Sequence, residues 1–70
     1  MSEIKYFSLN GHYYYTNQNL TLADIILYFD YHDSLLVLEC NNLIYNKNKW
    51  HQTFISNFDK LEIVSIVGGG

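Results

Sequence analysis

The sequence predicts a single α+β domain in which a mixed β-sheet packs against one helix. Two strand-like segments flank an Asn-Gly turn near the N-terminus, an amphipathic helix follows, and further strand-like segments complete the chain. Seventy residues, 49% of them hydrophobic, are enough for one small core and argue against disorder. A chain of this size buries about 60% of the surface that its unfolded form exposes, so we expect modest stability.

The first two strands are predicted to form a hairpin. Residues 4–9 are rich in β-branched and aromatic side chains, and residues 12–16 repeat that composition. Asn10-Gly11 lies between them, and this dipeptide favours a type I′ turn because both central positions need positive φ. The Tyr13-Tyr14-Tyr15 run alternates between the two faces of its strand, so at least one ring is expected to be exposed.

One helix is predicted after the polar residues 17–19. Thr21 and Asp24 have the spacing of a capping box, with Asp in place of the usual Glu or Gln. The following apolar residues have helical spacing and form one stripe, and the polar composition of residues 30–33 indicates the end of the helix. The stripe consists of Leu22, Ile25, Ile26 and Phe29.

The second half of the chain is predicted to complete the sheet. Residues 35–40 form an apolar strand, residues 43–45 a short one, and residues 60–67 the last one, after a turn at 57–59. Residues 46–58 lack periodicity and are expected to fold back onto the core through Trp50, Phe54, Ile55 and Phe58. The predicted core comprises Phe7, Leu9, Leu22, Ile25, Ile26, Phe29, Leu36, Leu38, Leu61 and Ile63.

Charge and cysteine content exclude several classes of protein. The net charge is −3, with four lysines and no arginine, which disfavours nucleic-acid binding and favours a basic partner. No apolar run approaches the length of a membrane span, and the N-terminus has neither signal-peptide nor transit-peptide character. Cys40 is the single cysteine, so a disulfide framework is not expected.

Other chemically interesting residues have structural explanations. Cys40 lies in an apolar strand without a neighbouring base, so we expect an inert core thiol. The histidines lack metal-ligand spacing, and Trp50 is expected to fill the core. Asp30 and Asp33 are expected at a solvated helix end rather than in a catalytic pair. The three histidines are His12, His32 and His51.

The C-terminus is the most unusual segment. A strand-like run is followed by Gly68, Gly69 and Gly70, and the sequence ends there. Such a terminus is either a frayed end or a segment whose carboxylate enters the site of another protein. The predicted organisation is therefore a folded domain over residues 1–67 and a glycine tail over residues 68–70.

Several short motifs occur in the same order as in a known family. They are L9-N10-G11, L20-T21-L22-A23-D24-I25-I26, L38-E39-C40-N41, K49-W50, D59-K60-L61-E62-I63-V64 and G68-G69-G70. In these motifs the chain resembles the ThiS family of ubiquitin-like sulfur carriers, which implies a β-grasp fold. Two positions differ from the family pattern: Asn46-Lys47 stand where proline and arginine are frequent, and Asn57-Phe58-Asp59 stand where Asp-Gly-Asp is frequent.

The resemblance implies that Gly70 carries sulfur. In this family a ThiF-like adenylyltransferase uses ATP and Mg²⁺ to adenylate the terminal carboxylate. Sulfur from a donor such as a cysteine desulfurase then replaces AMP and leaves a thiocarboxylate. The thiocarboxylate supplies a ThiG-like thiazole synthase that makes the thiazole of thiamine. The carrier itself is expected to have no cofactor, no metal and no catalytic activity.

The glycine tail suits that role physically. Gly68 and Gly69 have no Cβ, so they fit a narrow channel and adopt whatever φ the channel requires. Val64 and Ile66 are predicted to face away from the helix and to form an apolar docking patch beside the tail. The alternative is that the segment from Trp50 to Phe58 covers this patch.

Two other functions remain open from the sequence. One is the small subunit of molybdopterin synthase, which shares the architecture and ends in Gly-Gly. The other is a ubiquitin-like modifier or interaction module whose glycines become joined to lysines. The expected location is a bacterial cytoplasm, or the plastid stroma if the gene is plastid-encoded.

Overall fold

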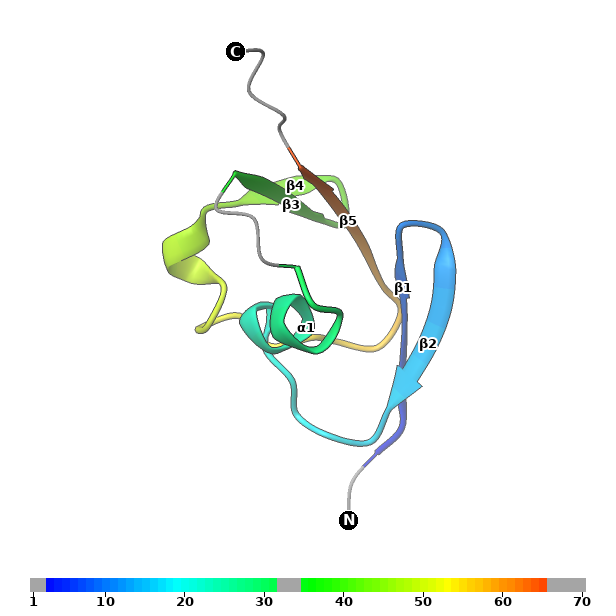
Figure 1. Ribbon diagram of the computed structural model, residues 1–70. Coiled ribbons are helices and arrows are strands. Elements are labelled where there is room, and N and C mark those ends of the chain that lie inside the picture. Colours follow the sequence, from blue (N-terminus) through cyan, green and yellow to red (C-terminus); the bar gives the residue numbers. More distant parts are fainter. Residues whose placement is uncertain (1–2, 32–34, 66–70) are drawn as a thin grey trace.

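The computed structural model describes residues 3–31 and 35–65. Figure 1 shows a sheet curving around a single helix. The elements in chain order are β1 (Lys5–Leu9), β2 (His12–Thr16), α1 (Leu22–Tyr28), β3 (Leu36–Cys40), β4 (Leu43–Tyr45), the 3-10 helix η1 (Lys47–Lys49) and β5 (Asp59–Ser65). The predicted last strand extended to residue 67, and residues 66–67 lie outside the described ranges, as does the glycine tail.

The sheet is mixed, as the sequence predicts. Its five strands lie in the order β2-β1-β5-β3-β4. β1 pairs antiparallel with β2 and parallel with β5, and β3 pairs antiparallel with both β5 and β4. The last strand of the chain is therefore the central strand of the sheet.

Two hairpins turn through residues with positive φ. Asn10 has φ 50° and Gly11 has φ 84°, which confirms the predicted turn between β1 and β2. Asn41 and Asn42, with φ 54° and 71°, make the corresponding turn between β3 and β4. Asparagine is among the few residues with a side chain that adopt this region at low cost.

The predicted capping box starts α1. The Asp24 N–H donates to Thr21 Oγ1 at 3.1 Å, and the Thr21 N–H donates to Asp24 Oδ2 at 2.9 Å. The shorter aspartate therefore makes the reciprocal bond that glutamate usually makes. The helix ends at Tyr28, close to the predicted end, and Asp30 then adopts a φ of 63°.

The core lies between the sheet and α1. It contains Phe7, Leu9, Leu22, Ile25, Ile26, Leu38, Cys40, Trp50, Ile55, Leu61 and Ile63. Every residue of the predicted core is among them except Phe29 and Leu36, which are only partly buried and pack against the core. Phe29 follows the last helical residue, and Leu36 begins β3, so both lie at the rim.

The segment between β4 and β5 packs against the start of α1. The Leu22 N–H donates to the Thr53 carbonyl at 2.9 Å, and the Ile55 N–H donates to the Leu20 carbonyl at 2.8 Å. Trp50 and Ile55 are buried, as predicted, and the Trp50 Nε1–H donates to the Tyr45 carbonyl at 2.9 Å.

The prediction was wrong for Phe54 and Phe58. Their side chains are 59% and 77% exposed, and neither belongs to the core. Phe54 bridges Thr21 in an extended conformation, so its side chain points opposite to that of the buried Ile55. Phe58 has a φ of 69°, and its ring stacks on Tyr6, itself half exposed, with centroids 6.4 Å apart.

Candidate functional site

The predicted tail follows β5 in the sequence, so the end of β5 is the described part of the chain nearest to it. Ser65 is the last described residue before the C-terminus, and Leu36 of β3 pairs with it. Gly68, Gly69, Gly70 and Ile66, all predicted site residues, lie outside the described residues. Of the predicted site, the structure therefore describes Val64 and the strand that carries it.

The side chains of β5 alternate between the core and the outer face. Leu61 and Ile63 are 0% and 4% exposed, whereas Val64 is 55% exposed. This alternation agrees with the predicted orientation of Val64, away from the helix. Trp50 and Ile55 belong to the core on the helix side of the sheet, so their segment leaves Val64 uncovered.

Val64 belongs to a larger group on the outer face. Val37 pairs directly with Val64, and paired residues in neighbouring strands point to the same face. Ile44 of β4 lies on this face too and is 67% exposed. We call Val37, Ile44 and Val64 the outer patch. The predicted docking residues do not include Val37 and Ile44, although the alternation within each strand could have identified them.

Two carboxylates accompany the outer patch. Glu39 pairs with Glu62 across β3 and β5, and Glu39 also pairs with Ile44. Both side chains therefore point to the outer face. Like charges directly opposite each other in a sheet repel, so a cation placed over the pair is favourable there.

The side chain of Asn10 bonds β5 at Ile63, the residue before Val64. Its Oδ1 accepts a hydrogen bond from the Ile63 N–H at 2.8 Å, and its Nδ2 donates to the Ile63 carbonyl at 3.2 Å. The sequence predicts Asn10 only as a residue of the turn. The distance of 53 residues between the two partners explains why no local pattern revealed this contact.

Cys40 is a buried thiol, as predicted. Its side chain is 5% exposed, and burial, followed by the charge of Asp59 and a hydrogen bond to it, raises the pKa of Cys40 to about 11 from an ordinary value of 9.0. The thiol is therefore protonated at neutral pH. A protonated, buried thiol is a poor nucleophile and a poor metal ligand.

The structure describes His12 and His51 among the histidines, and Asp30 of the two aspartates expected at the helix end. His32 and Asp33 lie outside the described residues. Within residues 3–31 and 35–65, no three His, Cys, Asp or Glu side chains gather where they could hold a metal ion. No helix in the same ranges is long and apolar enough to cross a membrane.

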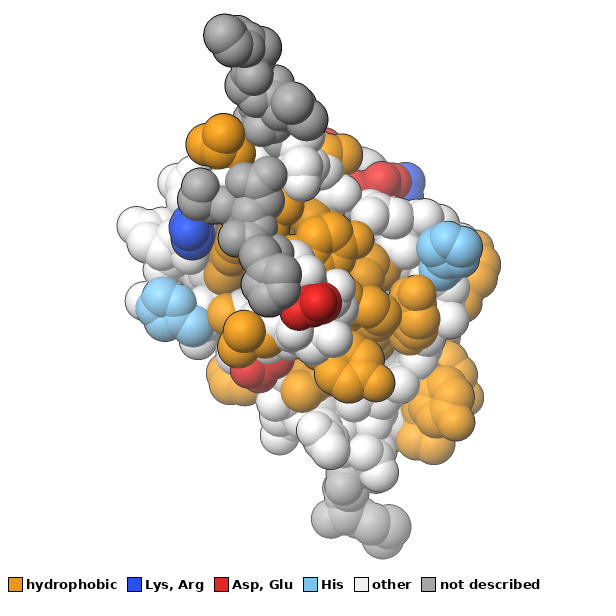
Figure 2. Space-filling model, in the orientation of Figure 1, with side chains coloured by type: hydrophobic (Ala, Val, Ile, Leu, Met, Phe, Trp, Pro, Cys, Tyr) orange, Lys and Arg blue, Asp and Glu red, His pale blue; other side chains and the backbone are white. Residues whose placement is uncertain are grey.

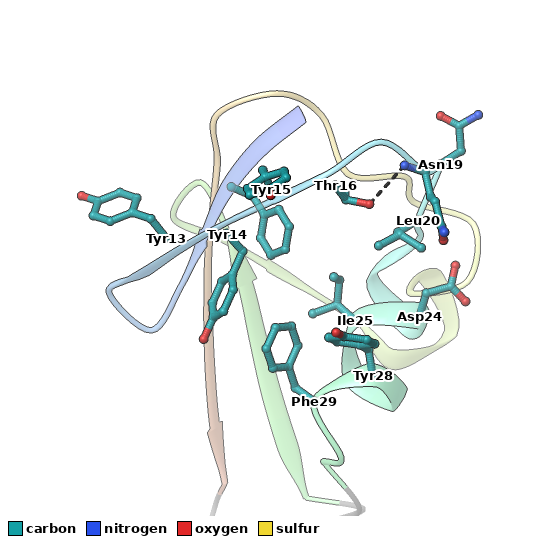
Figure 3. A pocket seen from close by; sticks show the side chains of 12 residues that line it. Tyr13, Tyr14, Tyr15, Thr16, Asn19, Leu20, Asp24, Ile25, Tyr28 and Phe29 are labelled. Carbon is teal, nitrogen blue, oxygen red and sulfur yellow. Dashed lines mark hydrogen bonds between the residues drawn. The ribbon is translucent and has the colours of Figure 1, made fainter. Parts of the chain in front are cut away.

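An open groove of about 730 Å³ lies between β2 and α1. Figure 2 shows that hydrophobic side chains gather on this face of the molecule, and Figure 3 shows Tyr14, Tyr28 and Phe29 around the groove. Tyr14 packs edge-on against Phe29, with centroids 4.9 Å apart. Tyr13 is 88% exposed, which confirms that at least one ring of the tyrosine run is exposed, as predicted.

The groove does not have the composition of a catalytic site. Asp24, its acidic residue, is used by the helix cap, because its Oδ2 accepts the Thr21 N–H. Figure 3 shows the Asp24 carboxylate at the edge of the groove, away from Tyr14. The groove therefore offers aromatic surface but no nucleophile and base in contact among the described residues that line it.

Known proteins match this chain over nearly its whole length. The model of the ThiS family matches residues 7–70. The uncharacterized protein ycf40 of Trieres chinensis is 54% identical over 70 residues, covering 100% of this chain and 96% of that protein. The ycf40 protein of Porphyra purpurea is 32% identical over 62 residues, covering 89% of this chain and 87% of that protein.

A solved structure shows the same fold. The crystal structure of the thiamine biosynthesis protein ThiS from Geobacter metallireducens matches with a TM-score of 0.79, covering 93% of this chain and 99% of that one. The sequence identity is 16%, so this likeness concerns the fold. It confirms the predicted β-grasp architecture.

Proposed function

The chain belongs to the ThiS family of β-grasp sulfur carriers, and we propose that its Gly70 carries sulfur for the thiazole of thiamine. The observation that supports this most directly is the extent of the family match, which continues through residue 70 and so includes all three terminal glycines. A match limited to the folded domain would support the fold without the tail.

The proposed chemistry begins at the terminal carboxylate. A carboxylate oxygen of Gly70 attacks the α-phosphorus of ATP, and pyrophosphate leaves. A sulfur nucleophile then attacks the acyl carbon, and AMP leaves. With sulfide as nucleophile this is a substitution without a redox change, whereas a persulfide donor gives an acyl disulfide that a thiol must then reduce. ATP and Mg²⁺ belong to the adenylating partner in this scheme.

The properties of Cys40 support an external sulfur source. Its thiol is buried and protonated at neutral pH, so this chain has no reactive thiol of its own to offer. Sulfur comes instead from a partner such as a cysteine desulfurase. The chain acts as a carrier, and the ThiF-like adenylyltransferase and ThiG-like thiazole synthase perform the catalysis.

The outer patch is the proposed docking surface for these partners. Val64 lies one residue before the last described residue, in the strand that precedes the tail, and this nearness in the chain supports the proposal. Val37 and Ile44 extend the apolar area, and Glu39 and Glu62 favour a partner surface that adds a basic residue. Ile66 remains a proposed part of the same surface.

The proposed location is the plastid stroma. The relatives in Trieres chinensis and Porphyra purpurea are both called ycf40, a name that suggests a plastid genome. This support favours the stroma over the cytoplasm of a bacterium.

Removing Gly69 and Gly70 tests the function. The new carboxylate, on Gly68, then ends about 7 Å short of its former position, at about 3.3–3.6 Å per extended residue. We expect this variant and Gly70→Val to fail in pyrophosphate exchange with the adenylating partner and to gain no sulfur by intact mass. The melting temperature should stay unchanged, because neither change removes a residue of the described core. Normal thiocarboxylation of the shortened chain would refute the proposal.

A further inference from the structure

On the side of β5 that faces β1, the strand pairing ends before β5 does, and the side chain of Asn10 bonds the backbone there instead. The parallel pairing of β1 with β5 covers only Asp59, Lys60 and Leu61, because β1 ends at Leu9. The pairing of β3 with β5 continues to Ser65. Beyond Leu61, the side chain of Asn10 lies on the β1 side of β5 and bonds both backbone groups of Ile63.

The Asn10 amide is almost fully used. The side-chain Nδ2 donates to Tyr31 Oη at 3.2 Å and to the Ile63 carbonyl. The backbone N–H of Asn10 separately donates to the Leu61 carbonyl at 2.9 Å. Its Oδ1 accepts the Ile63 N–H. One residue thereby joins the hairpin turn, the chain after α1 and the end of β5.

From this geometry we propose that Asn10 is a positioning residue that fixes the direction in which β5 leads to the reactive terminus. The inference rests on the proposed function and extends it to a residue in the first hairpin. Adenylation needs near-contact between the Gly70 carboxylate and a phosphorus atom, and a misplacement of about 1 Å can lower the rate on the order of 100-fold. Residues 66–70 follow Ser65 in the sequence, and Ser65 lies two residues after Ile63, which Asn10 contacts. Added freedom at the end of β5 therefore enlarges the range of starting directions from which Gly70 must reach the phosphorus atom.

The positive φ of 50° and the amide together explain why asparagine suits this position. Glycine would keep the turn but remove all three side-chain bonds. Aspartate would keep the turn and accept the Ile63 N–H, but it would place an oxygen against the Ile63 carbonyl. The series from Asn to Asp to Gly therefore removes the contact in steps without changing the backbone requirement of the turn.

Asn41 provides a matched control in the other hairpin. It has a φ of 54°, its N–H donates to the Lys60 carbonyl at 2.8 Å, and its Oδ1 accepts the Lys60 N–H at 2.9 Å. The two asparagines thus have the same type of turn position and hold the same strand. Asn41 does so at the start of β5, whereas Asn10 does so near its end.

The experiment compares N10G, N10D and N41G with the native chain in pyrophosphate exchange, measuring kcat and KM for the carrier. We expect kcat to fall about tenfold or more in N10G, with KM changed less than about twofold. N10D should lie between N10G and the native chain, and N41G should keep kcat within about twofold of native. Equal losses of kcat in N10G and N41G would overturn the inference, because both would then reflect destabilisation alone.

A second readout does not depend on adenylation. Backbone order parameters for Val64 and Ser65, measured by NMR, should fall in N10G and stay native in N41G. Unchanged values in N10G would overturn the inference even if the carrier is active. If instead the native chain is not adenylated but the order parameters change as expected, the proposed function fails and the structural role of Asn10 stands.

Discussion

Val64→Asp is the most direct test of the outer patch. Val64 is 55% exposed in the free protein, so about half of its surface is available to a partner. Burying a whole valine side chain contributes about 1.5–3 kcal/mol, and covering half of it therefore contributes roughly 1 kcal/mol. On this basis alone, Val64→Ala should weaken binding of the adenylating partner about fivefold.

Aspartate should have a larger effect than alanine. A carboxylate buried without a partner charge costs about 3–5 kcal/mol, which corresponds to a loss of affinity on the order of 100-fold or more. Glu39 and Glu62 lie on the same face and already use the basic residue proposed for the partner, so they add repulsion to a third carboxylate. The ratio between the alanine and aspartate variants therefore indicates whether the partner desolvates this position.

Tyr13→Asp is the matched control for charge. Tyr13 is 88% exposed on the edge strand β2, so the substitution adds the same charge to a strand that β1 separates from β5. Affinities are measured by isothermal titration calorimetry with the adenylating partner, and circular dichroism checks the fold. We expect Tyr13→Asp to bind within about twofold of native and Ile66→Asp to behave like Val64→Asp. Equal affinity of Val64→Asp and the native chain would refute the docking surface.

Two further predictions concern stability and pH. Ile26 is 8% exposed, so Ile26→Ala should lower the free energy of unfolding by about 2–5 kcal/mol in urea titrations. Leu27→Ala on the same helix should change it by less than about 0.5 kcal/mol, because Leu27 is 77% exposed, and similar losses in both would contradict the assigned helix face. The pKa of Cys40 is about 11 in the folded chain and ordinarily 9.0, so the folded state holds this proton more tightly and stability should fall as pH rises from 9.0 to about 11. Cys40→Ala should remove that part of the pH dependence, and an unchanged slope would show that other groups cause it.

Local signals predicted the fold well because they depend on neighbouring residues. The Asn10-Gly11 turn needs only positive φ at two positions, and the cap needs only Thr21 and Asp24 three residues apart. The inward side chains of β5 followed from a period of two. For the same reason, the exposure of Val64 could be predicted from the positions of Leu61 and Ile63.

Contacts between distant segments could not be predicted in this way. Residues 46–58 have no periodicity, and the orientation of Phe54 depends on hydrogen bonds that join Leu20 and Leu22 to Ile55 and Thr53. The exposure of Phe58 follows from a turn conformation that its side chain does not favour. The glycine tail is a different case, because its proposed role came from the resemblance and no fold-forming pattern distinguishes it from a frayed end.

The position of β5 in the sheet relates the fold to the proposed function. An edge strand can peel away by losing one set of backbone hydrogen bonds, whereas β5 lies between β1 and β3. Releasing its end requires breaking the pairing with Leu36 and the Asn10 contacts, and releasing its start exposes Leu61 and Ile63 to water. The parallel pairing of β1 with β5 is what places β5 at the centre of the sheet. A carrier needs a terminus that enters another protein from a base that does not move, and β5 meets the second requirement because β3 bonds it on one side, and β1 and then the Asn10 side chain bond it on the other.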